Sequence, residues 1–438
     1  MNSSSAIVQT VPSSEPSPMH ATRLRSLQAL GIFCGFAAGA WLGGAEAPIK
    51  LVNPDISPVT ISLIMVFGVF LARWSVPALI RGTSHVRHDV RQAPHLIVWA
   101  VLAGCMWAVA NTLTIYAIRN VGLSIAFPLW NTNSLLGIFW GFLLFNELRH
   151  AGWRRWLGVL GGAVFMFAGA TLLAVALSHR GAAGEARLGI IAALGAGVLW
   201  GTMYIPYRKA YLTGMNPLSF ITFFTVGELA TMIAVALAYR GATPLWHELI
   251  SARAVLFWLM IGGFVWVIGD LFQQYATKYV GISRGIPLSN TNQLWGLLWG
   301  ILVFHELRGG SQTIYAQVAG GSLLMALGAV AIALSSANAR EHSYWQDAAA
   351  REGQRYRVEG EYVRAGMEGK HFGANPGNRT LLDWLLILGT TALFVVLAVM
   401  ARLPRVDIAL GWAFALLIAM VALLASCGVA LWRTTRFR

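Results

Sequence analysis

One stretch of the sequence occurs twice. A shift of 159 residues aligns 99–149 with 258–308 without a gap, and 22 of these 51 positions are identical. "PLWNTN" at 128–133 lies over "PLSNTN" at 287–292, and "NELR" at 146–149 lies over "HELR" at 305–308. Apolar composition alone does not bring Pro, Asn, Glu and Arg into register. The sequence therefore indicates two copies of one folding unit.

Both copies consist of apolar runs long enough to cross a bilayer. The chain is 57% hydrophobic and 11% charged, whereas a soluble domain has about 25% charged residues. Runs of about 20 apolar residues predict membrane helices, because a helix satisfies its own backbone hydrogen bonds in lipid. We therefore predict an all-α polytopic membrane protein. Twelve spans are expected, at 28–46, 59–80, 96–117, 121–145, 156–178, 188–206, 217–239, 254–276, 280–304, 313–336, 381–401 and 407–432.

Five of these spans fall in residues 26–180 and five in 186–336. Because five is odd, the second unit starts from the opposite face, which predicts an inverted repeat, a common architecture of secondary transporters. With the N-terminus inside, 21 Lys and Arg lie on the inner side and nine outside, and two, Arg73 and Arg284, lie within spans. This bias predicts orientation, with both termini cytoplasmic. It also accounts for the net charge of +14 without a nucleic-acid partner.

Three further regions are expected outside the repeat. Residues 1–25 are predicted to be a disordered cytoplasmic N-terminus, and 337–380 a polar cytoplasmic segment rich in Arg and Glu. Residues 381–438 are predicted to form a C-terminal two-helix hairpin for packing or oligomerisation, so a homodimer is left open. The sequence has no P-loop, no metal-ligand spacing and no catalytic constellation. We expect no enzyme activity, no cofactor and no metal.

Asparagines lie at the centres of the fourth and ninth spans. An unsatisfied amide costs several kcal/mol at this depth, so these side chains should face other helices or a wet cavity. Amides suit the hydroxyl groups of a neutral solute, and pairing between the two copies is the alternative. The prolines of both motifs, Pro128 and Pro287, predict kinked or interrupted helices there. The candidate substrate-binding asparagines are Asn131, Asn133, Asn290 and Asn292.

Four other polar or aromatic side chains join the candidate substrate site. Trp107 and Trp266 occupy equivalent mid-helix positions, where an aromatic face suits a sugar ring, although core packing is the alternative. Asn111 and Gln274 lie on the same two helices. We expect these residues to contribute with the asparagines to one solute site between the two units.

Two acids are candidates for coupling to an ion. Glu228 and Asp270 lie well inside their spans, where an ionisable residue is a functional hypothesis. A buried carboxyl group is a candidate proton carrier, and the alternative is a structural ion pair with Arg284 or Arg73. By contrast, Glu147 of "NELR" is expected at the membrane interface as an anchor for its helix end.

The pattern resembles a known transporter superfamily. Two sets of five helices, a glycine-rich first helix and "ELR" after the fourth helix of each unit resemble the drug/metabolite transporter superfamily over about residues 25–336. Within it, "WGTMYIPYRKAY" at 200–211 is similar to the glucose/ribose porter branch. The resemblance implies uptake of a small polar solute, above all a sugar.

The leading hypothesis is thus a secondary active transporter in the cell membrane (the inner membrane of a Gram-negative cell) that works by alternating access. Its partners would be the lipid bilayer, a small-molecule solute and, as an open point, protons. One alternative is an exporter of a metabolite or cationic drug that uses Glu228 or Asp270. Another is a membrane assembly protein that transports nothing.

Overall fold

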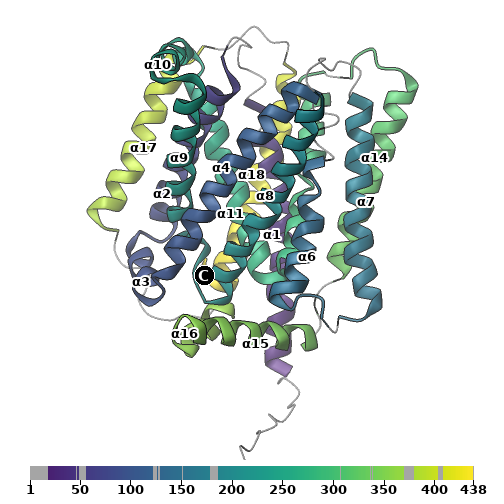
Figure 1. The fold of residues 1–438 in the computed structure, drawn as a ribbon, viewed down its shortest axis with the longest axis vertical. Helices are drawn as coiled ribbons and strands as arrows, with labels where there is room; N and C mark the ends of the chain where they lie inside the picture. The colour runs from purple at the N-terminus through teal and green to yellow at the C-terminus, as the bar shows by residue number, and fades with distance from the viewer. Residues whose placement is uncertain are drawn as a thin grey trace, which may run out of the picture.

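The computed structural model describes residues 18–45, 47–48, 56–121, 126, 129–149, 151–177, 186–305, 307–335, 337, 339–368, 379–402 and 408–437. Within these residues the regular structure is helical throughout, which confirms the all-α prediction. Ten helices of the described chain are long and apolar enough to cross a membrane. The protein is a multi-pass membrane protein, and its long helices run roughly side by side (Figure 1).

The helices follow the predicted order. In the first unit they are α1 (Pro18–Ala45), α2 (Pro58–Ile80), α3 (Ser84–Gln92), α4 (His95–Val121), α6 (Asn133–Phe145) and α7 (Trp153–Leu177). In the second they are α8 (Ala186–Leu212), α9 (Pro217–Arg240), α10 (Ala242–Ser251), α11 (Leu256–Val280), α12 (Ile282–Ser289), α13 (Asn292–Leu298) and α14 (Gln312–Leu334). After these come α15 (Ala339–Arg355), α16 (Gly360–Met367), α17 (Leu381–Met400) and α18 (Leu410–Thr435).

The two spans with the proline–asparagine motif are not single long helices. In the second unit α12 ends at Ser289, Asn290 and Thr291 form a turn, and α13 starts at Asn292. The backbone N–H of Asn290 closes this end on the carbonyl of Ile286 at 3.1 Å. The interruption therefore follows Pro287, which lies inside α12. In the first unit α6 starts at Asn133 after a turn at 131–132, and Pro128 lies outside the described residues.

Glycines let the neighbouring helices approach both turns. A methyl group at Gly39 of α1 would collide with the Thr291 side chain, and one at Gly43 would collide with the Asn292 carbonyl. In α8, Gly197 and Gly201 lie in the same way against the turn at 131–133. The glycine spacing of four residues thus places one face of α1 and one face of α8 directly against an interrupted helix.

The long helices pack in matched pairs. α1 packs on α11 and α8 packs on α4, while α7 packs on α14 and α2 packs on α9. α15 and α16 lie across one end of the bundle, together with α3 and the start of α1 (Figure 1). We call this the basic end, because the chain segments there carry Arg81, Arg87, Arg91, Arg149, Arg154, Arg155, Arg208 and Lys209.

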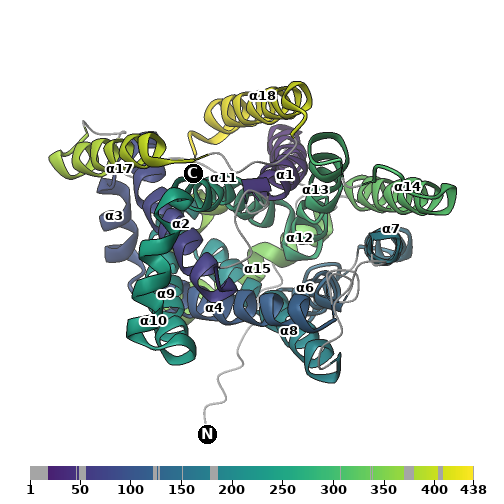
Figure 2. The same cartoon turned by 90° about the horizontal axis from the view of Figure 1, so that it is seen from above.

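Two predictions about the outer regions are corrected. Residues 18–25 belong to helix α1, and 1–17 lie outside the described residues. Leu24 is buried at the basic end, so α1 is extended beyond the bilayer-spanning run by packing there. The predicted hairpin is split: α17 packs on α2 and α11, whereas α18 packs on α1. The two helices lie on different parts of the bundle rim (Figure 2), because each covers apolar bundle surface.

At the opposite end, α10 is held by a carboxylate. Glu248 accepts hydrogen bonds from Ser57 at 2.6 Å and from Thr60, and it pairs with Arg240. Burial acts to raise the pKa of the Glu248 carboxyl, but the hydroxyl hydrogen bonds and the Arg240 charge outweigh it and hold the pKa below its ordinary value of 4.5.

Candidate functional site

One buried arginine joins both candidate coupling acids. Arg73 of α2 contacts Glu228 of α9 at 3.1 Å (Nη1 to Oε2) and Asp270 of α11 at 2.8 Å (Nη2 to Oδ2). All three side chains are 0% exposed. Two buried carboxylates and one guanidinium would leave a net negative charge in a low-dielectric interior, which is costly. One proton on the group makes it neutral.

The two acids are not equally well supported. Asp270 accepts a second hydrogen bond from Gln274 Nε2 at 2.9 Å, and Tyr211 in turn donates to Gln274. Asp270 and Gln274 are four residues apart and therefore share a helix face. Each acid has one carboxyl oxygen without a partner among the described residues, but Glu228 accepts only the Arg73 bond there, one bond fewer than Asp270. Asp270 is thus the better place for the negative charge, and Glu228 for the proton.

Aromatic rings line this charged group. The Arg73 guanidinium carbon lies 3.9 Å from the Phe224 ring centroid and 5.4 Å from that of Trp266. Trp266 meets Trp107 edge-on, with ring centroids 5.2 Å apart. The structure therefore brings together the two candidate tryptophans and places one of them beside Arg73. A planar cation between ring faces is stabilised by the ring quadrupole.

A second polar chain connects the neighbourhood of Asp270 to the broken helix α12. Gln273 Nε2 donates to Ser289 at 2.6 Å and to the Tyr204 hydroxyl at 3.4 Å. Ser289 is the last residue of α12, next to Asn290. Two consecutive residues of α11 thus have different partners: Gln274 bonds to the charged group, and Gln273 bonds to the last residue of α12.

The asparagine motifs contact each other. Asn290 Nδ2 donates to Asn133 Oδ1 at 3.3 Å and to Ser134 Oγ at 2.6 Å. Asn131 is also buried, yet its Nδ2 has no hydrogen-bond partner among the described residues. The structure thus pairs one asparagine of each motif. Because buried amides nearly always have a hydrogen-bond partner, solute binding stays the prediction for Asn131.

The remaining two candidates lie apart from these groups. Asn111, the repeat equivalent of Asp270, donates to Ser62 of α2 at 3.2 Å. Asn292 is half-buried at the start of α13, with its carbonyl against Gly43. Neither makes a described contact with the Arg73 group, and their roles stay predictions.

Glu147 lies in a different environment from the one that the sequence predicts. It was expected at the interface, but it is 0% exposed and pairs with Arg208 of α8 at 2.8 Å. Its carboxylate also accepts the backbone N–H groups of Ile282 and Ser283, at 3.1 and 2.8 Å. These are orphan donors of the first turn of α12, so Glu147 caps the broken helix from the other unit.

Arg73 joins the two candidate acids, whereas the sequence alone indicates it only as one of two alternative ion-pair partners for them. The sequence does single out Arg73, because it is one of two basic residues that lie within predicted spans. The other, Arg284, was the competing partner for the acids, but it binds Glu341 of α15 instead, at 2.7 and 2.9 Å. Periodicity along one chain does not show which acid meets which base across the bundle.

The comparisons with known proteins decide the family. The sequence profile of the sugar transport protein family matches residues 53–176 and 190–354, well over half of the chain. The chain belongs to the sugar transport protein family. Its members are transporters rather than enzymes, as predicted for this chain.

Several curated proteins are similar to this member of the sugar transport family. A Listeria innocua protein named for sugar uptake is 22% identical over 238 residues, which are 53% of this chain and 77% of that protein. A Streptococcus pyogenes serotype M1 protein, also named for sugar uptake, is 35% identical over 108 residues, 24% of this chain and 34% of its own. Transmembrane protein 144 homolog B of Dictyostelium discoideum is 29% identical over 154 residues, 34% of this chain and 41% of its own.

Proposed function

We propose that this member of the sugar transport family takes up a sugar by alternating access, coupled to protons through Glu228 and Asp270. The observation that carries this proposal is the buried group between α2, α9 and α11, in which Arg73 binds both acids. The names of the relatives favour uptake over export. We place the protein in the cell membrane with both termini cytoplasmic, as the charge bias favours.

Proton coupling follows from the charge balance of this group. With one proton the group is neutral and tolerates full burial, and without it the excess charge favours a conformation that readmits water. The opening of the group would then depend on loading or releasing that proton. Solute binding would be supplied by the adjacent tryptophan pair and by amides such as that of Asn131, which offers both donors and an acceptor to hydroxyl groups.

We also propose that the two five-helix units form an inverted repeat of the drug/metabolite transporter type. The packing supports this: α1 on α11 is the repeat equivalent of α8 on α4. Glycine pairs in α1 and in α8 contact the two asparagine turns in the same way. Such paired close contacts allow one unit to rock against the other about a central site.

The alternative of cationic-drug export needs a carboxylate that is available to a cation. In this structure Arg73 already binds both candidate acids. A cationic solute would have to displace a buried guanidinium that contacts two carboxylates and an aromatic ring. The geometry therefore favours a neutral solute.

Uptake into proteoliposomes tests the proposal. Purified protein is reconstituted and offered a panel of radiolabelled neutral sugars and polyols under an inward proton gradient. We expect accumulation of at least one sugar, and its loss when the gradient is collapsed. Glu228→Gln should keep sugar exchange at zero gradient but lose gradient-driven accumulation. Asp347→Asn, an exposed change on α15, is the matched control.

Two outcomes would argue against the proposal in different ways. If the folded protein neither exchanges nor accumulates any solute of the panel, sugar uptake is refuted. If a sugar accumulates equally with and without the proton gradient, uptake stands and proton coupling is refuted.

A further inference from the structure

The α15–α16 segment, residues 339–368, is not part of either predicted five-helix unit. It lies across the basic end, and α15 crosses beneath the middle of the bundle (Figures 1 and 2). Its composition predicts a polar cytoplasmic segment. Within it, Glu341 and Trp345 are buried, at 0% and 1% exposure. A charged side chain such as that of Glu341 is almost never fully buried unless it is paired.

Glu341 connects α15 to the broken helix α12. Its carboxylate binds the Arg284 guanidinium through two bonds of 2.7 and 2.9 Å. The same carboxylate accepts the backbone N–H of Leu148 at 2.8 Å, in the "NELR" turn after α6. One α15 residue therefore bonds the first unit and the second unit at the same point. Two hydrogen bonds between one arginine and one carboxylate also fix the relative orientation of the two side chains.

Trp345 covers the second ion pair at this end. The Arg208 guanidinium carbon lies 4.6 Å from the Trp345 ring centroid. Arg208 pairs with Glu147, the residue that caps α12. These two buried ion pairs thus both involve α12: α15 supplies the carboxylate of one and covers the other.

Further contacts attach the segment to three other helix ends. Lys209 of α8 pairs with Glu352 at 3.2 Å, and the His95 ring of α4 stacks on Tyr356 at 3.9 Å. The Tyr362 hydroxyl of α16 donates to Asp89 of α3 at 2.8 Å. The segment therefore bonds to ends of both units, which cannot separate at this end while these contacts hold.

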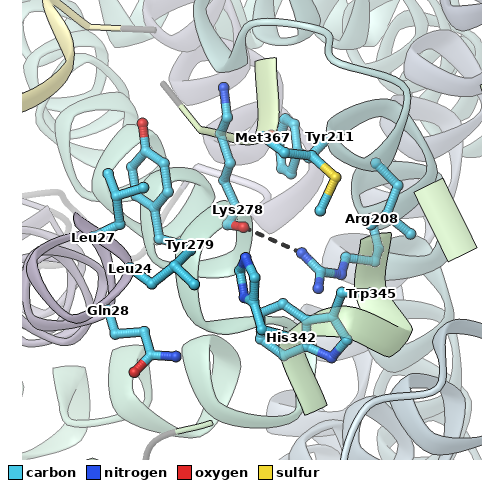
Figure 3. A pocket seen from close by; sticks show the side chains of 11 residues that line it. Leu24, Leu27, Gln28, Arg208, Tyr211, Lys278, Tyr279, His342, Trp345 and Met367 are labelled. Atoms are coloured by element: carbon cyan, nitrogen blue, oxygen red, sulfur yellow. Dashed lines mark hydrogen bonds between the residues drawn. The ribbon is translucent and has the colours of Figure 1, made fainter. Parts of the chain in front are cut away.

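Behind this cover lies a small cavity of about 10 Å³, room for a single water. Its wall includes Tyr211, whose hydroxyl bonds to Gln274 in the buried charged group. Figure 3 shows Arg208 and Trp345 on one side of this space, with Tyr279 and Leu27 on the other. The cavity thus lies between the charged group and α15.

We propose that the α15–α16 segment is the gate of the basic end, and that solute leaves through this cavity when Glu341 and Trp345 move off Arg284 and Arg208. The inference rests on the proposed transport function for the identity of what passes. It assigns to the segment a role that the two repeated units do not supply. The gate is closed in this structure, because both ion pairs are complete and Trp345 is buried.

Thiol accessibility tests the gate without any transport. A cysteine-free chain, with Cys34, Cys105 and Cys427 replaced by alanine, receives Leu212→Cys in the cavity wall. In nanodiscs, a charged maleimide should label this thiol about tenfold faster or more after Glu341→Gln, because that change breaks a buried two-bond ion pair. Asp347→Asn on the same helix should leave the rate unchanged. Ser251→Cys, exposed at the opposite end, is a second control, because faster labelling there as well would indicate that the whole fold has loosened.

A reversible cross-link provides a second test that does not depend on the folding of Glu341→Gln. Lys209→Cys and Glu352→Cys, whose native side chains contact across α8 and α15, are joined by a bis-methanethiosulfonate. Sugar flux into proteoliposomes should fall by about tenfold or more and recover on reduction, because the gate is held shut. Sugar binding, measured by thermal shift, should persist.

The two measurements separate the gate from the transport proposal. An unchanged labelling rate in folded Glu341→Gln protein, or full flux through the cross-linked protein, overturns the gate. If the uncross-linked protein moves no sugar at all, the transport proposal fails, and the labelling rate alone still decides whether α15–α16 closes the cavity.

Discussion

The buried group of Arg73, Glu228 and Asp270 makes a quantitative prediction about paired substitutions. Glu228→Gln, Asp270→Asn and the double variant each change carboxyl groups into amides of nearly the same shape. Because one guanidinium serves both acids, either acid alone can neutralise it. The single variants should therefore be mild and the double variant severe.

The magnitudes follow from the partners of each acid. If Glu228 holds the proton, its replacement removes no charge and costs about 1 kcal/mol, one neutral hydrogen bond. Asp270→Asn removes the favoured anion, but Glu228 can then ionise beside Arg73, so we expect a cost of about 1–2 kcal/mol. The double variant leaves a fully buried arginine unpaired, at a cost of about 3–5 kcal/mol. The coupling energy between the two sites is then about 1–2 kcal/mol.

The assay is SDS-driven unfolding in mixed micelles at pH 7, followed by tryptophan fluorescence. The matched control is the triple variant that adds Arg73→Met. Removing the last charge should recover most of the stability lost in the double variant, because an apolar replacement of a buried ion group is close to neutral. The reasoning is refuted if the two single effects simply add, or if Arg73→Met lowers the stability of the double variant further.

Three other outcomes are expected. Asn133→Ala should lower the free energy of unfolding by about 1 kcal/mol through the lost interhelix bond, whereas Asn131→Ala should leave it unchanged and weaken sugar binding in a thermal-shift titration. The depressed pKa of Glu248 stabilises the fold above pH 4.5, so the advantage of wild type over Glu248→Gln in thermal unfolding should be present at pH 7 and shrink as pH falls below that value. Gly43→Val should lower the melting temperature more than Gly411→Val, because an added Cβ at 43 would collide with the Asn292 carbonyl, whereas one at 411 has no described atom within 4 Å.

The sequence predicts the membrane architecture well because hydropathy is a local property. The apolar runs become helices over the described residues, and both runs with a proline–asparagine motif contain a turn there. The depth of Glu228 and Asp270 follows from their positions in the spans, and an arginine partner was one of the two alternatives. Each of these features depends on one helix and the lipid around it. The sequence of that helix is therefore enough to predict it.

The basic end was not predictable in the same way. Glu147 reads as an interfacial acid until Arg208 and the first turn of α12 are placed beside it. The polar composition of 337–380 predicts a cytoplasmic segment, but it does not predict that Glu341 of α15 is buried against Arg284. Both cases depend on contacts between segments more than 50 residues apart. Periodicity gives the face of a helix, but it does not give the neighbour that covers it.

The contact between the asparagine motifs carries a consequence for the transport cycle. Under the 159-residue shift Asn131 is equivalent to Asn290, and Asn133 to Asn292. The observed bond joins Asn133 to Asn290, so it pairs non-equivalent residues. If the two units exchange conformations, as an inverted repeat does in alternating access, the bond in the other state joins the remaining two, Asn131 and Asn292. Cysteines at 131 and 292 should therefore cross-link in the Glu341→Gln background and not in its parent, and equal cross-linking in both would exclude this exchange.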